Sequence, residues 1–290
     1  MKKIKHEETV YINPLIDFGF KRIFGNERVM MGFLNALIQV DDPDTEIVDL
    51  VFLPTDTKGE ADEERGVIYD LRCKTNDGSE FIVEMQKKGQ SFFNKRILFY
   101  LSRAIASQDD SLKDEKWRFQ THNVYGVFLM NFYDDTMTEP VRHCVIKDYK
   151  SNVIDNYGMQ YWKIELPFYR KIKESDCKTH LDKWLYIIAN MKTMKAKLPF
   201  TDEIPILRDV EFLAKYSKMN TDDRNRYWKS YDQYVTTLGA IDYAREEGAQ
   251  KERSSIVLKM SAKGYSAQDI SEIAEIPVDE VEMIIKNKVE

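Results

Sequence analysis

The pattern of apolar positions predicts two helices near the start of the chain. From Asp17 to Val40 apolar residues recur every three or four positions, except near Gly25 and Asn26. Positions with this spacing share one face of a helix, so we expect two helical segments that meet at the break. The next apolar run, Ile47 to Leu53, is rich in β-branched residues and stops before Pro54, which predicts a buried strand.

A β-hairpin is predicted next. The runs Val67 to Lys74 and Phe81 to Gln86 flank the turn tripeptide Asn76-Asp77-Gly78. A short Asn/Asp/Gly segment between two β-prone runs is typical of a hairpin. The acidic segment that precedes it, Asp56 to Arg65, predicts a solvated loop.

The pattern in the middle of the chain predicts a layered α/β domain. Asn94 to Gln108 returns to helical spacing, and Asn123 to Phe132 is a nearly continuous apolar run. A strand of that kind is buried on both faces, which requires helices on both sides of a sheet. Two further strands are predicted at His143 to Ile146 and at Gln160 to Leu166.

Only helices are predicted beyond Pro167. The helical stretches are Lys178 to Ala196, Ile206 to Ser217 and Asp222 to about Leu258. We therefore expect three parts: an α/β domain over residues 1–170, a helical extension over 171–250 and a small helical module over 251–290.

The terminal module resembles a small helix-turn-helix. Ser266 and Pro277 or Val278 open its two short helices. Its second helix carries acidic residues that repel phosphate, so dimerisation or a vestigial module is favoured over reading of DNA bases. The expected core is Ile270, Ile273, Ala274, Val281 and Ile284, and the acidic residues are Asp279, Glu280 and Glu282.

Composition limits the class of protein. The 290 residues carry a net charge of -6, so nucleic acid would have to meet a local cationic patch. Cys73, Cys144 and Cys177 lack the paired spacing of zinc sites or disulfide frameworks, which fits a reducing cytoplasm. The opening lysines precede no apolar stretch and no run is long enough to cross a bilayer, so we expect neither signal peptide nor membrane span.

The hairpin also carries candidate chemistry. Alternation places Glu84 and Gln86 on the same face of one strand, with Asp70 on the adjoining strand. A carboxylate pair beside a backbone carbonyl offers the hard oxygen ligands that Mg²⁺ accepts, and the Gln86 amide can orient water or phosphate. From spacing alone, acidic residues on the wet face of an edge hairpin are the commoner arrangement.

Four segments resemble a known family. The order INPLIDFGFKRIFG, FLNALI, YDLRCKTNDGSEFIVEMQ and FNKRILFYLSR is similar to that of the recombination-promoting nucleases and transposases of the PD-(D/E)XK superfamily. The resemblance extends from about Tyr11 to about Pro167. It implies a restriction-endonuclease-like αβββαβ core with a central mixed sheet, and cleavage of DNA with Mg²⁺ or Mn²⁺.

The resemblance also assigns roles. The motif aspartate maps to Asp70 and the glutamate to Glu84, which would bind the metal. Gln86 stands where the superfamily pattern has lysine, so stabilisation of hydroxide would fall to the metal ion. Lys87 is adjacent, but alternation directs it away from the site.

Two further pairs are candidates for accessory or phosphate-binding roles. Asp17 and Lys21 lie one helical turn apart on a face that superfamily members use near the metal, although an exposed ion pair explains them equally well. Arg96 and Tyr100 share a helix face and can contact phosphate, or be a surface arginine beside a core tyrosine. No role is assigned to the isolated histidines, which are His6, His122, His143 and His180.

The sequence and this resemblance together predict a cytoplasmic, metal-dependent DNA endonuclease, and the resemblance implies a link to recombination or mobile elements. The predicted partners are DNA and, in a homodimer, a second copy of the chain. The alternative function is a DNA-binding or oligomerising protein that keeps the nuclease fold without catalysis. A full transposase would also need strand joining, for which the sequence has no sign.

Overall fold

The computed structural model describes residues 10–57, 67–108 and 121–287. The chain divides into two compact units, Met1–Trp228 and Lys229–Glu290. Within the described residues, no helix is both long and apolar enough to span a membrane.

The first two helices form where the apolar spacing predicts them. Helix α1 covers Asp17–Phe24 and α2 covers Glu27–Ile38. Asn26 separates them, and its side-chain oxygen accepts a hydrogen bond from the backbone N–H of Val29 at 3.2 Å. A cap of this kind contributes about 1 kcal/mol to helix stability, which explains why α2 begins at this residue.

Six strands form one mixed sheet among the described residues. Their order is β1-β4-β5-β6-β8-β7, with β5, β6 and β8 parallel and the other pairings antiparallel. The sheet is therefore parallel at its centre and antiparallel at both edges. The strands are β1 (Leu50–Phe52), β4 (Leu71–Thr75), β5 (Glu80–Gln86), β6 (Val124–Met130), β7 (Val141–Lys147) and β8 (Ile154–Glu165).

The predicted hairpin is correct at its turn and wrong in its first arm. The run Val67 to Lys74 divides, because β3 (Val67–Ile68) pairs with β2 (Asp56–Thr57) in a separate two-stranded sheet. The segment predicted as an acidic loop therefore begins as a strand, and residues 58–66 lie outside the described residues. The first sheet strand is also shorter than predicted, at Leu50–Phe52.

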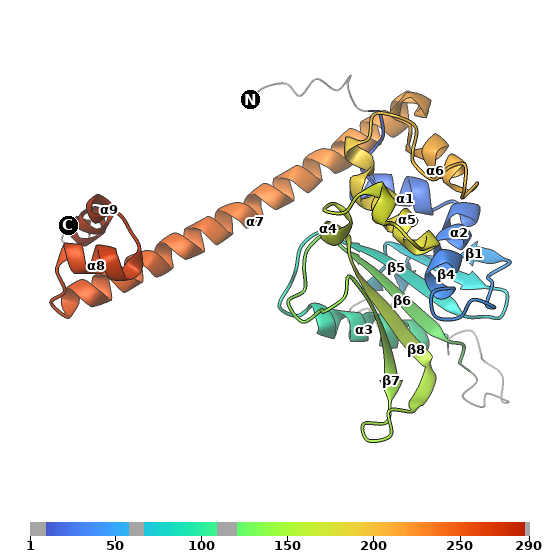
Figure 1. Ribbon diagram of the computed structural model, residues 1–290, viewed down its shortest axis with the longest axis horizontal. Coiled ribbons are helices and arrows are strands. Elements are labelled where there is room, and N and C mark those ends of the chain that lie inside the picture. The colour runs from blue at the N-terminus through green and yellow to red at the C-terminus, as the bar shows by residue number, and fades with distance from the viewer. Residues whose placement is uncertain (1–9, 58–66, 109–120, 288–290) are drawn as a thin grey trace. The chain divides into compact units, whose positions relative to one another are not determined.

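Helix α3 (Phe93–Ala106) covers one face of the large sheet (Figure 1). Its residues Ile97 and Leu101 pack against Ile82 of β5 and Phe128 of β6 in a buried apolar cluster. Gly126 of β6 lies beneath this helix, and a side chain there would stand 3.0 Å from Leu101. The absence of a side chain at this position thus lets the helix approach the sheet closely.

The two faces of the sheet carry different residues. The register aligns Glu84, Phe128 and Lys163 across β5, β6 and β8 on the face of α3. Phe81 and Tyr125 are aligned in the same way on the opposite face, because side chains alternate along a strand. The helix–strand order and the mixed sheet confirm the predicted restriction-endonuclease-like α/β fold.

The chain beyond β8 is helical as predicted, but the helices begin and end at other residues than predicted. Helices α5 and α6 pack against the first two helices within the first unit. The three-part division expected at residues 170 and 250 stays a prediction. The elements are α4 (Leu166–Tyr169), α5 (His180–Asn190), α6 (Leu207–Ala214), α7 (Thr221–Ala262) and the short 3-10 turns Glu174–Asp176, Met191–Thr193 and Tyr216–Lys218.

The second unit ends in the two short helices α8 (Ala267–Ala274) and α9 (Val278–Lys286). Ser266 caps α8 as predicted, through a capping box with Asp269. Ile273 is 63% exposed, so its assignment to the core was wrong; Ile276, 5% exposed, lies in the core instead. Helix α8 ends at Glu275, which has a positive φ of 53°, and Ile276 follows directly after this turn. The buried core is Val257, Ile270, Ile276 and Val281.

Candidate active site

Asp70 and Glu84 are brought together by two reciprocal hydrogen bonds. Asp70 lies at the bend between β3 and β4 and not within a strand, which corrects the predicted position. Its Oδ2 accepts from the backbone N–H of Met85 at 2.8 Å, and Oε1 of Glu84 accepts from the N–H of Asp70 at 2.9 Å. These bonds fix the two carboxylates side by side.

Burial rules out the wet-face interpretation of Glu84. This residue is 1% exposed, and β5 lies between β4 and β6 inside the sheet. A buried carboxylate without full compensation is costly, so such a group is retained where it has a partner or a task. The acidic hairpin face is therefore part of the interior of the protein.

The environment opposes ionisation of both carboxyls. Burial, followed by the charge of Asp70, raises the pKa of Glu84 to about 8. Burial also raises the pKa of Asp70, although the hydrogen bond from Met85 and the charges of Lys21 and Lys87 act in the other direction. Two desolvated carboxyls that repel each other favour either protons or a cation.

Gln86 and Arg96 complete a polar cluster around Glu84. The Gln86 Nε2 donates to Oε2 of Glu84 at 3.1 Å, so the two side chains share one face of β5 as predicted. An Nη1–H of Arg96 donates to Oε1 of Gln86 at 3.4 Å, and its Nη2 stands 3.6 Å from Oε2 of Glu84. Alternation in the strand explains the first contact, and the packing of α3 explains the second.

Tyr100 supports Arg96 from one helical turn away. The guanidinium of Arg96 lies over the Tyr100 ring, 4.8 Å from its centroid. Tyr100 also packs edge-to-face on Tyr69, whose hydroxyl donates to the Tyr100 carbonyl at 3.1 Å. The shared helix face was predicted, and it holds the cation of Arg96 beside the carboxylates.

Asp17 and Lys21 form the ion pair that their spacing predicts. Their charged atoms are 2.9 Å apart, and their side chains are 47% and 43% exposed, respectively. Their charges also reach the site, since that of Lys21 lowers and that of Asp17 raises the pKa of Asp70. Lys87 has a similar effect on Asp70, which the alternation argument did not anticipate because β5 ends at Gln86.

The donor set fits a divalent cation. No group of three or more His, Cys, Asp or Glu side chains that could hold a metal is found in the described part of the chain. Asp70 and Glu84 nevertheless offer two hard carboxylate donors whose burial and mutual repulsion a cation would relieve. Two protein carboxylates with open positions for water and phosphate are sufficient for Mg²⁺.

Comparison with known proteins gives a family match. A model described as PD-(D/E)XK nuclease family transposase matches residues 14–244. The match includes every candidate site residue from Asp17 to Tyr100, and it continues beyond Pro167, where the resemblance in sequence was looser. No curated protein and no solved structure matches the chain.

Proposed function

Because the chain belongs to the PD-(D/E)XK nuclease family transposases, we propose that it is a metal-dependent endonuclease that hydrolyses phosphodiester bonds of DNA. The family supports a nuclease- or transposase-associated role. The observation that carries the finer proposal is the convergence of Asp70, Glu84 and Gln86 in a buried polar cluster.

Asp70 and Glu84 would hold Mg²⁺ or Mn²⁺. When bound, such an ion neutralises charge on the phosphate and activates the attacking water. The protein contributes preorganisation: the hydrogen bonds from Met85 and from the Asp70 backbone fix both carboxylates before substrate arrives.

Gln86 and Arg96 would position the phosphate. Gln86 has no charge to replace the lysine of the superfamily pattern, and Arg96 lies 3.4 Å from its side-chain oxygen. A guanidinium presents paired donors that match phosphate oxygens. We therefore assign to Arg96 the cationic contact that Gln86 cannot make, with Tyr100 as its support and Lys21 as a further phosphate contact.

DNA is the proposed partner, and the cytoplasm the proposed compartment. Despite the net charge of -6, the cations Lys21, Lys87 and Arg96 all act electrostatically on Asp70 or Glu84. A local cationic surface of this kind can attract the DNA backbone although the chain as a whole is acidic.

Nicking of supercoiled plasmid tests the proposal. The purified chain should nick with Mg²⁺ or Mn²⁺ and not with EDTA. Asp70→Asn and Glu84→Gln should both lose the activity, while the exposed Asp44→Asn should keep it. Cleavage that survives both site substitutions would assign the activity to other residues.

The assays also distinguish two other functions. A chain that binds DNA but cuts under no metal condition would be a silent member that retains the nuclease fold. A transposase would also join a donor end to target DNA, and a strand-transfer assay with a labelled end distinguishes it from a nuclease that only cuts.

A further inference from the structure

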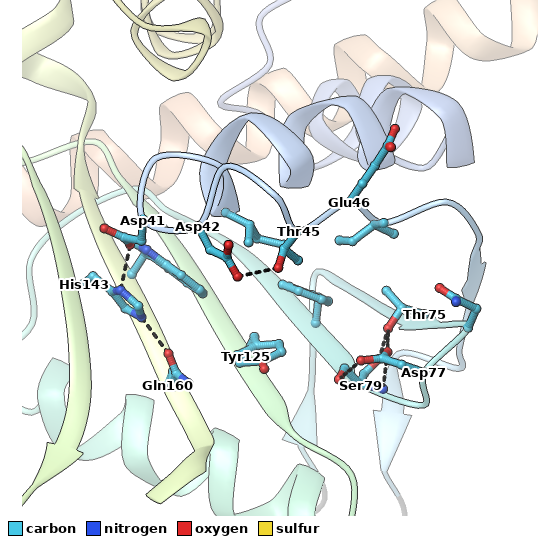
Figure 2. A pocket seen from close by; sticks show the side chains of 15 residues that line it. Asp41, Asp42, Thr45, Glu46, Thr75, Asp77, Ser79, Tyr125, His143 and Gln160 are labelled. Carbon is cyan, nitrogen blue, oxygen red and sulfur yellow. Dashed lines mark hydrogen bonds and ion pairs between the residues drawn. The ribbon is translucent and has the colours of Figure 1, made fainter. Parts of the chain in front are cut away.

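A pocket lies on the sheet face opposite the candidate active site. It has a volume of about 380 Å³, within the range of roughly 300–1,000 Å³ typical of small-molecule sites. Phe81 and Tyr125 line it from β5 and β6, and the connection between α2 and β1, which includes Asp41 and Asp42, lines it from the other side (Figure 2). Glu84 points to the other face of β5, so this pocket is separate from the metal site.

The sheet side of this acidic pocket is aromatic. The rings of Phe81 and Tyr125 are 4.8 Å apart, and Trp162 lies 6.1 Å from Tyr125. His143 stacks on Trp162 with a centroid distance of 4.2 Å and an interplanar angle of 15°. Four strands thus place four aromatic rings along one surface, and the negative face of an aromatic ring attracts cations.

Hydrogen bonds hold the histidine at one end of the pocket. Its Nδ1 lies 2.8 Å from Oδ2 of Asp41, and its Nε2 lies 2.8 Å from Oε1 of Gln160 (Figure 2). These two contacts of His143 join the α2–β1 connection to β7 and β8. The aromatic surface and the acidic connection therefore keep a fixed relation to each other.

The remaining lining is negatively charged. Asp41, Asp42, Glu46 and Asp77 line the pocket, and its described lining contains no lysine or arginine. Although burial opposes it, hydrogen bonds from Thr75 and Ser79 lower the pKa of Asp77, so this carboxyl is ionised at neutral pH. Phosphate groups are repelled here, and the pocket is not a continuation of a DNA-binding surface.

We propose that the acidic pocket binds a small organic cation with an amidinium, guanidinium or ammonium head. Charge complementarity selects the head, since four carboxylates line the pocket and His143, beside Asp41, is the one basic side chain in its described lining. The half-buried ring of Tyr125 selects the body, because a flat or aliphatic cation packs on its face. The site is independent of the proposed nuclease activity.

Calorimetric titration of the full chain tests this proposal with benzamidine and its neutral near-isostere benzamide. Benzamidine should bind at least about tenfold more tightly, because only its amidinium is attracted by the carboxylates. The double variant Asp41→Asn/Asp42→Asn should weaken benzamidine binding by at least about tenfold. Asp44→Asn removes one charge from the same connection outside the lining, and it should leave the affinity unchanged.

Two further variants separate the contributions. Tyr125→Leu removes the half-buried ring and should weaken the binding of benzamidine. An unchanged circular dichroism spectrum shows that this variant is folded. Asp70→Asn should bind benzamidine as the native chain does, whether or not it cuts DNA. The proposal is overturned if benzamidine and benzamide bind equally, if neither binds below about 10 mM, or if Asp44→Asn weakens binding as much as the double variant.

Discussion

The backbone N–H of Asp70 donates to the side chain of Glu84 at 2.9 Å, so the peptide of one candidate ligand orients the carboxylate of the other. The reverse link passes through Met85, whose N–H donates to Asp70. The two carboxylates are held together although burial raises the pKa of both, and the charge of Asp70 raises the pKa of Glu84 further. Perturbed pKa values of this kind are common at functional sites.

Asp70→Asn should stabilise the metal-free protein while it abolishes metal-dependent cleavage. Asparagine keeps an oxygen that can accept from Met85 and removes the charge that raises the pKa of Glu84. We expect Tm in EDTA to rise by about 2–4 °C, the shift that corresponds to ~1 kcal/mol in a domain of this size. Scanning calorimetry measures it, and a lower Tm would show that the Asp70 charge is not repelled in the native site.

The stability of the metal-free protein should fall as the pH rises from about 4.5 to about 8. The folded pKa of Glu84 lies above its ordinary value of 4.5, at about 8. The folded state therefore retains a proton that the unfolded chain has released, and this difference disfavours folding progressively across that interval. Urea denaturation at several pH values should detect the slope, and Glu84→Gln should flatten it.

Divalent metal should reverse this trend. Binding requires both carboxyls to be ionised, so protons compete with Mg²⁺ or Mn²⁺, and the rise in Tm on adding metal should be larger at about pH 8 than at about pH 6. At a metal concentration about a hundredfold above Kd the gain approaches ~2.7 kcal/mol. Asp70→Asn is the control, and an equal Tm rise in that variant would place the ion elsewhere.

The sequence predicted the parts of the site that depend on local periodicity. Alternation along one strand places Glu84 beside Gln86, and helical spacing places Arg96 beside Tyr100. Both relations depend on neighbours two to four residues apart. The link between the two pairs requires α3 to pack on the sheet, and no short-range pattern encodes that distance.

Long-range pairing explains what sequence reasoning missed. Asp70 was placed in a strand because the run Val67 to Lys74 is continuous in β propensity, whereas Val67–Ile68 pairs with Asp56–Thr57 and leaves Asp70 at a bend. The acidic pocket combines Asp41, Asp77 and His143, which are distant in the chain. Only the completed sheet brings them together.

Arg96→Leu should reduce cleavage more than Arg96→Lys. The guanidinium lies 3.6 Å from Glu84 and 3.4 Å from Gln86, and its charge lowers the pKa of Glu84. Loss of a cation placed against developing negative charge costs on the order of 10²–10³ in rate, as for an oxyanion donor. Lysine keeps the charge without the paired donors and should recover part of the rate.

Single-turnover nicking with saturating DNA separates this effect from weaker binding. If Arg96→Leu changes only the DNA concentration needed and not the single-turnover rate, Arg96 binds the backbone and does not act on the reacting phosphate. Equal rates for the leucine and native proteins at every DNA concentration would remove Arg96 from the proposed site.

Gly126→Ala should destabilise the first unit by about 1–3 kcal/mol, the usual cost of overpacking a core. A Cβ there would stand 2.6 Å from the Phe128 ring, 3.0 Å from Leu101 and 3.1 Å from the Cβ of Tyr161. Helix α3 would have to move away from the sheet, and Arg96 moves with it. Gly239→Ala is the matched control, because a Cβ on this α7 glycine meets nothing within 4 Å and alanine favours the helix. Urea denaturation should therefore show a lower free energy of unfolding for Gly126→Ala and a higher one for Gly239→Ala. A Gly126→Ala protein as stable as the native chain would mean that α3 does not pack as closely on β6 as the position of Leu101 indicates.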